Sequence, residues 1–328
     1  MKHSEQMAER CVGGGVVSVK INSVRAWWLA ARPKTLSAAL IPVCTASALA
    51  FAHDRFLLVP ALLCVSFAIF MQVAANFIND LFDFRKGTDG ADRLGPERAC
   101  AQGWISPRAM QVGIVVALIL AGIAGIGIVA LAFEQAAARH SATEVAMWLS
   151  VVGVACVLFA FLYTTLLSYC GLGDVLVWLF FGIVPVCGTY YVQTGGFSPE
   201  VWWLAAACGL VTDTLLVLNN YRDRDNDRRA GKRTLIVVLG EPFGRYFYLL
   251  QGVLGYLAAA MLALYGHMWM AVLPLFYVLP HYLTWRKMVQ IGSGRELNRV
   301  LGFTSRNMLT FAALCILALV AEQMPWDL

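Results

Sequence analysis

The apolar run 57–82 ends in Asn76-Phe-Ile-Asn79-Asp80-Leu-Phe-Asp83-Phe-Arg-Lys-Gly-Thr-Asp89. A second apolar run, 201–221, ends in Asn219-Asn220-Tyr-Arg-Asp223-Arg-Asp-Asn-Asp227 and also leads into a polar segment. Carboxylates at the edge of a bilayer are costly unless a cation binds them. The two stretches therefore predict that two membrane helices bring their acidic ends to a shared cation site.

The composition is that of a polytopic membrane protein. Of the 328 residues, 59% are hydrophobic and only 14% are charged, whereas a soluble domain has about 45–50% and about 25%. The net charge of +5 comes from basic residues in short segments between apolar runs and indicates no nucleic-acid partner. The nine cysteines are scattered, mostly inside apolar runs, which favours packing over a disulfide or metal framework.

Nine apolar runs predict an all-α fold. Most of them are long enough to cross a hydrocarbon core of about 30 Å as helices. We expect a single transmembrane domain over residues 26–328 and, before it, a flexible cytoplasmic tail over residues 1–25. The expected spans are 36–52, 57–82, 109–133, 145–168, 173–193, 201–221, 244–265, 269–288 and 305–322.

The basic residues predict how the bundle is oriented. With the N-terminus in the cytoplasm, every Lys and Arg except Arg55 and Arg139 falls in a cytoplasmic segment or at the cytoplasmic end of a span. This strong asymmetry is the expected positive-inside pattern. Both acidic stretches then lie on the cytoplasmic side, and nine spans put the C-terminus of this integral, multi-pass protein on the opposite side.

Polar side chains form a stripe on each of the two acid-ended helices. Helical periodicity places Gln72, Asn76, Asn79 and Asp83 on one face of the first helix, and Asp213, Asn220 and Asp227 on one face of the second. Clustered carboxylates and amides suit Mg²⁺, which takes one or two carboxylates together with substrate phosphate oxygens. The stripes therefore predict a magnesium site that carries a diphosphate.

Basic residues surround both acidic stretches and offer contacts for further phosphate oxygens. They are Arg85, Lys86, Arg93, Arg98, Arg222, Arg228, Lys232 and Arg233. The competing interpretation is that charges in cytoplasmic loops are solvated and only set the orientation. These charged segments adjoin stripes of Asn and Asp inside two helices, and this combination favours a binding site. Each single Lys or Arg still fits both roles, a phosphate contact or a residue that only sets the orientation.

The paired acidic stretches resemble the signatures of the UbiA superfamily of intramembrane prenyltransferases. Members carry an N-D-x-x-D-type motif after the second span and a D-x-x-x-D motif after the sixth. Arg32-Pro33-Lys34-Thr35-Leu36 resembles the opening motif of this family. Asp92-Arg93-Leu94-Gly95-Pro96 and Ala230-Gly231-Lys232-Arg233-Thr234-Leu235 resemble the branch that acts on 1,4-dihydroxy-2-naphthoate in menaquinone synthesis.

The resemblance implies a nine-helix bundle with a central cavity that faces the cytoplasm. It implies transfer of a polyprenyl group from a polyprenyl diphosphate to an aromatic acceptor. It also implies two Mg²⁺ ions as the cofactor and a location in the lipid bilayer. The implied metal residues are Asn79, Asp83 and Asp89 in one set and Asp223 and Asp227 in the other, with Asn220 alongside. Lys34 and Lys232 become candidate diphosphate contacts.

Further candidate substrate contacts come from the polar stripes and the basic segments, and they include Asn76, Arg93 and Arg222. Asp213 is either an acceptor or proton contact, or a polar residue bonded to a neighbouring helix. Tyr163 is either a wall of the active site or a packed aromatic residue.

The stretch from Tyr163 to Asp174, Tyr-Thr-Thr-Leu-Leu-Ser-Tyr-Cys-Gly-Leu-Gly-Asp, departs from the naphthoate branch, because it lacks the Gly-Gly pair and the basic residue that usually follow Tyr-Thr. A different aromatic acceptor is therefore an open alternative. A cation-coupled transporter and a transferase acting on lipid headgroup phosphates are alternatives from other classes. The histidines show no ligand spacing in the sequence, and we assign them no role.

Overall fold

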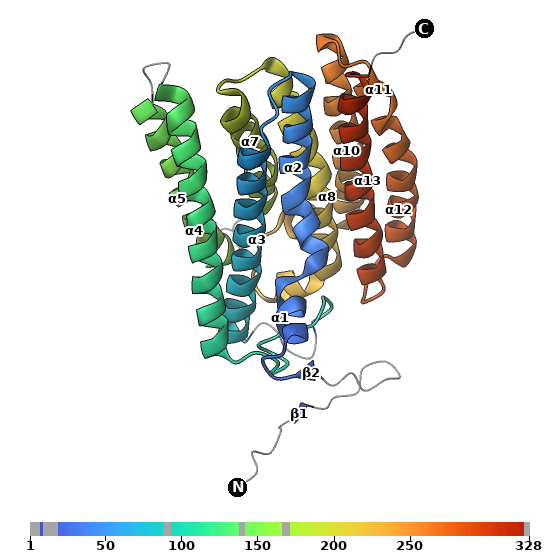
Figure 1. The fold of residues 1–328 in the computed structure, drawn as a ribbon. Helices are drawn as coiled ribbons and strands as arrows, with labels where there is room; N and C mark the ends of the chain where they lie inside the picture. Colours follow the sequence, from blue (N-terminus) through green and yellow to red (C-terminus); the bar gives the residue numbers. More distant parts are fainter. Residues whose placement is uncertain (1–6, 9–18, 88–92, 138–141, 166–170, 325–328) are drawn as a thin grey trace.

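The computed structural model is a bundle of long, roughly parallel helices (Figure 1). It describes all residues except 1–6, 9–18, 88–92, 138–141, 166–170 and 325–328. Two short strands in the described part form an antiparallel pair in which Met7 lies opposite Lys20. They fall inside the tail expected over residues 1–25, whose flexibility stays a prediction.

The first half of the bundle follows the two short strands, which are β1 (Met7–Ala8) and β2 (Val19–Lys20). Its helices are α1 (Val24–Ala31), α2 (Pro33–Ala52), α3 (Leu58–Lys86), α4 (Pro107–Ala137) and α5 (Ala142–Thr165). The second half begins with one broken span made of α6 (Gly173–Trp178), the π-helical η2 (Leu179–Ile183) and α7 (Val184–Thr194).

The remaining elements complete the second half of the bundle. They are α8 (Pro199–Arg229), α9 (Leu235–Leu239), α10 (Glu241–Ala260), η3 (Met261–Tyr265), α11 (Trp269–Val272), η4 (Pro274–Tyr277), α12 (Val278–Ile291) and α13 (Leu297–Ala321). α8 is the central helix, since 72% of its apolar window is buried in the protein, whereas only 6% of that of α5 is.

Eight helices in the described residues are long and apolar enough to cross a membrane. They coincide, within a few residues at most ends, with eight of the nine predicted spans. The ninth, 269–288, is a series of short helices in which α11 gives way to the 3₁₀ segment η4 at Pro274. Proline has no backbone N–H for regular helical bonding, so this stretch contains no single long helix and the count of nine stays a prediction.

The two acid-ended helices run further than the sequence predicts. α3 ends at Lys86, where Gly87 adopts a left-handed conformation (φ +69°) that glycine accommodates without strain. α8 continues to Arg229, beyond the expected end of its span at residue 221, so Asp223 and Asp227 both lie on the helix. This extension keeps Asp223 and Asp227 in fixed helical positions one turn apart.

Close contact between η2 and α8 holds the broken span against the central helix. A Cβ added to Gly182 would lie 2.6 Å from the carbonyl oxygen of Ala205 and 3.0 Å from the Cα of Gly209. Only glycine permits this approach of the two backbones. The contact positions α6, which precedes η2, beside α8.

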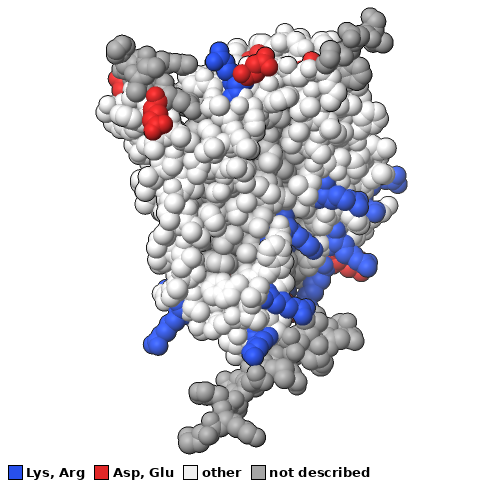
Figure 2. All heavy atoms as spheres, viewed as in Figure 1, with Lys and Arg blue, Asp and Glu red and all other residues white. Residues whose placement is uncertain are grey.

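Charged side chains are distributed unevenly along the bundle. Figure 2 shows Lys and Arg gathered toward the end that carries α1, below a broad surface without charged side chains. The outer helices α4 and α5 expose large apolar side chains, among them Val116, Ile119 and Ile123 of α4 and Trp148 and Val151 of α5. This surface has the character expected of a face in contact with lipid.

Candidate active site

A polar cavity of about 340 Å³ is lined by the C-terminal ends of both α3 and α8. Its acidic lining residues are Asp83, Asp174, Asp223 and Asp227. Its basic lining residues are Arg32, Lys34, Arg93, Arg98, Arg222 and Lys232, and its amides are Asn79, Asn219, Asn220 and Asn298. The two acidic motifs, far apart in the sequence, therefore face one shared space.

Three of the carboxylates are held by cations. Arg98 Nη2 donates to Asp83 Oδ2 over 2.9 Å. Arg222 forms a two-pronged contact with Asp223, with Nε–Oδ1 at 2.8 Å and Nη2–Oδ2 at 2.6 Å. Lys232 Nζ lies 3.6 Å from Asp227 Oδ1. These carboxylates face the cavity, where a divalent cation that carries a phosphate could reach them.

Arg222 also ties the motif of α8 to the opposite wall. Its Nη1 donates to Asn298 Oδ1 over 2.8 Å, and Asn298 Nδ2 donates to the carbonyl of Leu94 over 2.7 Å. Arg222 is 4% exposed, and its guanidinium packs tightly against Gly95, where an added Cβ would lie 3.0 Å from Nη2. This network fixes the guanidinium and so the Asp223 carboxylate.

A second, apolar cavity of about 360 Å³ adjoins the polar one. Its walls come from the spans α2 to α8. The two cavities share Thr35, Asn79, Leu215, Leu216 and Asn219. A molecule with a charged head and an apolar tail can therefore place its head among the acidic motifs and its tail between the helices.

Two residues of the predicted polar stripes support the walls and do not line either cavity. Asn76 is buried and donates to the carbonyl of Ala31 (2.8 Å) and to Thr35 Oγ1 (3.0 Å). It thereby holds the turn between α1 and α2, where Arg32 has a left-handed backbone (φ +52°). Asp213 is fully buried and accepts a hydrogen bond of 2.6 Å from Gln251 Nε2 of α10.

The other predicted site residues are distributed as follows. The cavity lining contains Lys34, Asn79, Asp83, Arg93, Asn220, Arg222, Asp223, Asp227 and Lys232. Asp89, the side chain of Tyr163 and residues 166–170 of the departing stretch lie outside the described residues. The role of Asp89 as a metal residue and that of Tyr163 as a substrate contact stay predictions.

Several cavity residues were not among the predicted site residues. The most prominent is Asp174, a buried carboxylate in the first turn of α6. The signal that points to it is an ionisable residue at the start of an apolar span, which marks functional positions in membrane proteins. The sequence indicates Arg32 only as part of the opening motif, and Arg98 only as one of the basic residues around the acidic stretches.

The chemistry of the lining fits magnesium bound to a diphosphate. Carboxylate and amide oxygens of α3 and α8 are hard ligands of the kind that Mg²⁺ prefers. Six basic side chains against four acidic ones leave the lining able to accept an anion. No sulfur or imidazole ligand lines the polar cavity in the described part of the chain, which disfavours a softer metal there.

Comparison with known proteins gives a consistent result. Residues 39–305 match the UbiA prenyltransferase family. The chain is 35% identical to a 1,4-dihydroxy-2-naphthoate octaprenyltransferase of Haemophilus influenzae, over 73% of this chain and 78% of that protein. It is 33% identical to the protein of the same name from Escherichia coli, over 80% and 86% of the two chains.

The fold is also similar to that of a solved structure. A UbiA homologue from Archaeoglobus fulgidus bound to DMAPP and Mg²⁺ superimposes with a TM-score of 0.62, covering 90% of this chain and 99% of that one. At 14% sequence identity, the likeness concerns the fold.

Proposed function

This chain belongs to the UbiA prenyltransferase family, and from that premise we propose that it transfers a polyprenyl group from its diphosphate to 1,4-dihydroxy-2-naphthoate. In this reaction the ring loses its carboxylate as CO₂. The reaction would be a step of menaquinone biosynthesis. The relatives are named as naphthoate octaprenyltransferases, which supports this acceptor and an aromatic polyprenyltransferase activity. The observation that carries the proposal is the convergence of both acidic motifs on one polar cavity that opens into an apolar one.

The diphosphate of the donor would lie in the polar cavity. Asn79 and Asp83 on α3, with Asn220, Asp223 and Asp227 on α8, would hold two Mg²⁺ ions, with Asp89 as a further candidate. When bound, the metal supplies charge neutralisation for the departing diphosphate. Lys34, Arg93 and Lys232 line the same space and would bind the remaining phosphate oxygens.

The isoprenoid chain would extend from the shared wall of the cavities into the apolar one. The first allylic carbon would then lie near Asn79 and Asn219, which line both spaces. Apolar side chains around that carbon exclude water, so an allylic cation would meet the acceptor ring before it meets water. A long tail exceeds about 360 Å³ and would continue into the lipid.

The bond changes balance without a further reactant. The allylic C–O bond breaks, and its electron pair leaves with the diphosphate. The ring carbon that bears the carboxylate forms the new C–C bond with the allylic carbon. The bond between that ring carbon and the carboxylate then breaks, CO₂ leaves, and the electron pair of the broken bond stays in the ring and restores its aromaticity. An ionised ring hydroxyl would make that carbon more nucleophilic.

Asp174 is the residue best placed to accept the hydroxyl proton. Among the cavity carboxylates it alone has no cationic partner in the described part of the chain, whereas Asp83, Asp223 and Asp227 are each paired. It is 7% exposed and lines the polar cavity. A buried carboxylate without a cation is a stronger base than one in an ion pair. Asp174 would therefore be the base that accepts the proton of the ring hydroxyl.

The orientation is proposed from the basic residues. The polar cavity lies at the end of the bundle where Figure 2 shows Lys and Arg gathered, which supports a cytoplasmic location for this end. Water-soluble naphthoate and Mg²⁺ would enter there, and the donor would arrive within the bilayer.

The test uses purified protein in detergent with a radiolabelled polyprenyl diphosphate and Mg²⁺. We expect a labelled, decarboxylated product with 1,4-dihydroxy-2-naphthoate, and release of diphosphate. 4-Hydroxybenzoate serves as the competing acceptor. Chelation with EDTA should stop the reaction, and added Mg²⁺ should restore it.

The two levels of the proposal fail separately. Turnover with hydroxybenzoate but not naphthoate would overturn the acceptor and leave the donor site intact. Absence of turnover with every acceptor, together with no Mg²⁺-dependent binding of polyprenyl diphosphate, would overturn the assignment of the polar cavity.

A further inference from the structure

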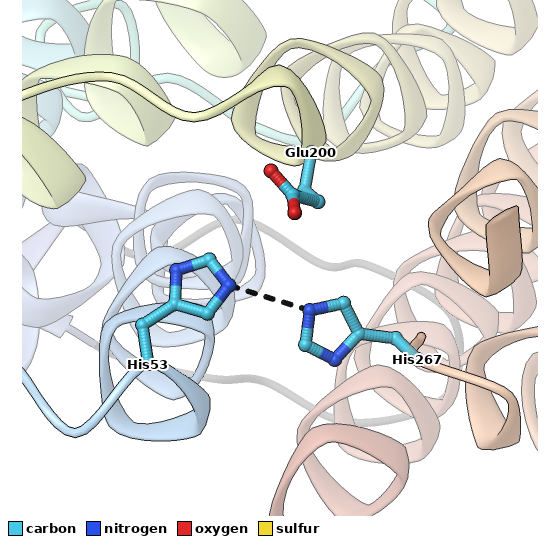
Figure 3. Close-up of side chains that lie close together, drawn as sticks. All are labelled: His53, Glu200 and His267. Atoms are coloured by element: carbon cyan, nitrogen blue, oxygen red, sulfur yellow. Dashed lines mark hydrogen bonds between the residues drawn. The ribbon is translucent and has the colours of Figure 1, made fainter. Parts of the chain in front are cut away.

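At the end of the bundle opposite the polar cavity, three potential metal ligands meet. His53 caps the end of α2, Glu200 lies in the first turn of α8, and His267 lies in the turn between η3 and α11 (Figure 3). One ligand atom from each lies within 4.8 Å of the other two. α2 has 20 residues between this cluster and Arg32, which lines the polar cavity, so about 30 Å of helix separates the two places.

We propose that His53, Glu200 and His267 form a binding site for one divalent transition-metal ion of the zinc type. The two imidazoles and the carboxylate would be the three protein ligands, with water in the fourth position. This set is typical of zinc sites. The proposal does not depend on the prenyl-transfer reaction, since none of the three residues lines either cavity.

The spacing of the imidazoles matches such an ion. His53 Nε2 and His267 Nε2 face each other at 3.4 Å. Two nitrogens bound to zinc at about 2.0–2.1 Å and at the tetrahedral angle lie about 3.3–3.4 Å apart. The two rings are tilted by 37° relative to each other, so their planes are not parallel.

The other nitrogen of each ring has a partner of the kind found behind metal ligands. His267 Nδ1 lies 2.6 Å from Glu322 Oε2, and that carboxylate can only accept, so Nδ1 carries the proton. With that proton on Nδ1, Nε2 is the ring nitrogen that can offer a lone pair to a metal ion in the cluster. Such carboxylate–histidine contacts orient imidazoles toward metals. His53 Nδ1 has a similar short contact with the Tyr190 hydroxyl at 2.6 Å.

The principal alternative is a chain of hydrogen bonds without metal. In it, Tyr190 donates to His53, and His53 Nε2 donates to His267 Nε2. This chain would satisfy both rings, but it leaves Glu200 unexplained. Glu200 Oε2 is a buried oxygen with no hydrogen-bond partner among the described residues, and burying an unpaired carboxylate oxygen is costly. A metal ion satisfies all three groups together.

The ion would tie together segments that are distant in sequence. α2, α8 and the turn after η3 carry the ligands, and Glu322 just after α13 supports His267 and accepts from the backbone N–H of Trp269 at 3.1 Å. The expected consequence is a clamp on this end of the bundle, which would stabilise the fold without touching substrate.

The test measures zinc binding to protein from which any histidine tag has been removed. Chelator-treated protein is titrated with Zn²⁺ in excess Mg²⁺, and bound metal is counted by mass spectrometry. We expect one Zn²⁺ per chain, and a rise in the melting temperature on binding. Removal of His53 or His267 (H53A, H267A) should weaken binding at least about a hundredfold, and E322Q about ten- to a hundredfold.

Matched variants separate a built site from general attraction to acidic groups. E200Q should weaken Zn²⁺ binding at least about tenfold, the lower end of what outer-shell losses cause. D54N removes an equal charge beside His53 from an exposed side chain and should leave the affinity within about twofold. D83N, in the polar cavity, should also retain one Zn²⁺. Bound Co²⁺ should show the visible absorption of a tetrahedral centre.

Two results would overturn the proposal. One is wild-type protein that binds Zn²⁺ no more tightly than the H53A/H267A double variant. The other is a loss of Zn²⁺ affinity in D54N that is as large as the loss in E200Q. Where an alanine variant does not fold, H53Q and H267Q replace it, since glutamine can keep one hydrogen bond of the ring, and the same two criteria apply.

Discussion

Asp80 and Asp83 lie three residues apart on α3, yet their carboxylates serve different partners. Asp80 is 1% exposed and accepts the backbone N–H groups of Ala99 and Cys100, both at 2.9 Å. Asp83 lines the polar cavity and pairs with Arg98, the residue just before those two amides. One carboxylate thus fixes the segment that carries the arginine, and the other receives the arginine.

Changing Asp80 to Asn should affect stability first. A hydrogen bond to a charged group contributes about 1.5–3 kcal/mol, and the amide keeps only one good acceptor for two N–H groups. We expect D80N to lose about 1–3 kcal/mol of stability, seen as a lower melting temperature. Turnover measured well below that temperature should fall less than tenfold. An unchanged melting temperature would contradict the structural role.

Changing Asp83 or Asp223 to Asn should abolish most turnover without unfolding the protein. Removing one preorganised electrostatic contact from an active site costs at least about a hundredfold in rate. The control is D225N, because Asp225 lies between Asp223 and Asp227 on α8 and its side chain is 65% exposed. Size-exclusion chromatography checks folding. Near-normal turnover in both D83N and D223N would remove these residues from the site.

Changing Asp174 to Asn should lower kcat and leave the KM for the donor nearly unchanged. Loss of a general base costs about 10²–10⁴-fold, and the donor diphosphate lies with the other carboxylates. The rise of kcat with pH should also flatten, because the amide does not titrate. Steady-state kinetics over a pH series measures both effects. A variant with raised donor KM and normal kcat would show that Asp174 binds and does not accept a proton.

Changing Gly188 to Leu should make the enzyme discriminate against long donors. Gly188 lines the apolar cavity, and a Cβ added there meets no atom within 4 Å. The leucine would occupy space proposed for the prenyl tail, so kcat/KM for an octaprenyl donor should fall tenfold or more, about 1.4 kcal/mol.

A short donor such as geranyl diphosphate should be affected less in G188L. The control is G122L on α4, where a Cβ also meets no atom within 4 Å but the position lies outside both cavities. If kcat/KM fell equally for short and long donors, the apolar cavity would not be the binding site of the prenyl tail.

The positions of the helices were predictable because they depend on local properties of the chain. Long apolar runs bounded by charged or turn residues form helices in a membrane whatever their neighbours are. The error at the end of α8 has the same origin. The prediction ended this helix at residue 221, where the apolar residues stop, but packing against its neighbours carries the helix to Arg229.

The candidate site was predictable to the extent that it repeats a local pattern. Asn79 and Asp83, or Asn220 and Asp227, lie on one face of their own helix, so spacing alone brings each set together. Asn76 and Asp213 belong to the same stripes, but they face other helices and not a cavity. Spacing places a residue on a face, and only the packing of the bundle decides what that face contacts.

The amino-acid sequence by itself therefore determined the class of protein, most of its spans and the acidic motifs, since hydropathy and helical periodicity act over neighbouring residues. Only the tertiary structure decided which distant residues meet. Asp174 became a cavity residue through the contact of α6 with α8, and His53 met His267 across 214 residues. Contacts of this kind arise from how whole helices pack, and no spacing along the chain records them.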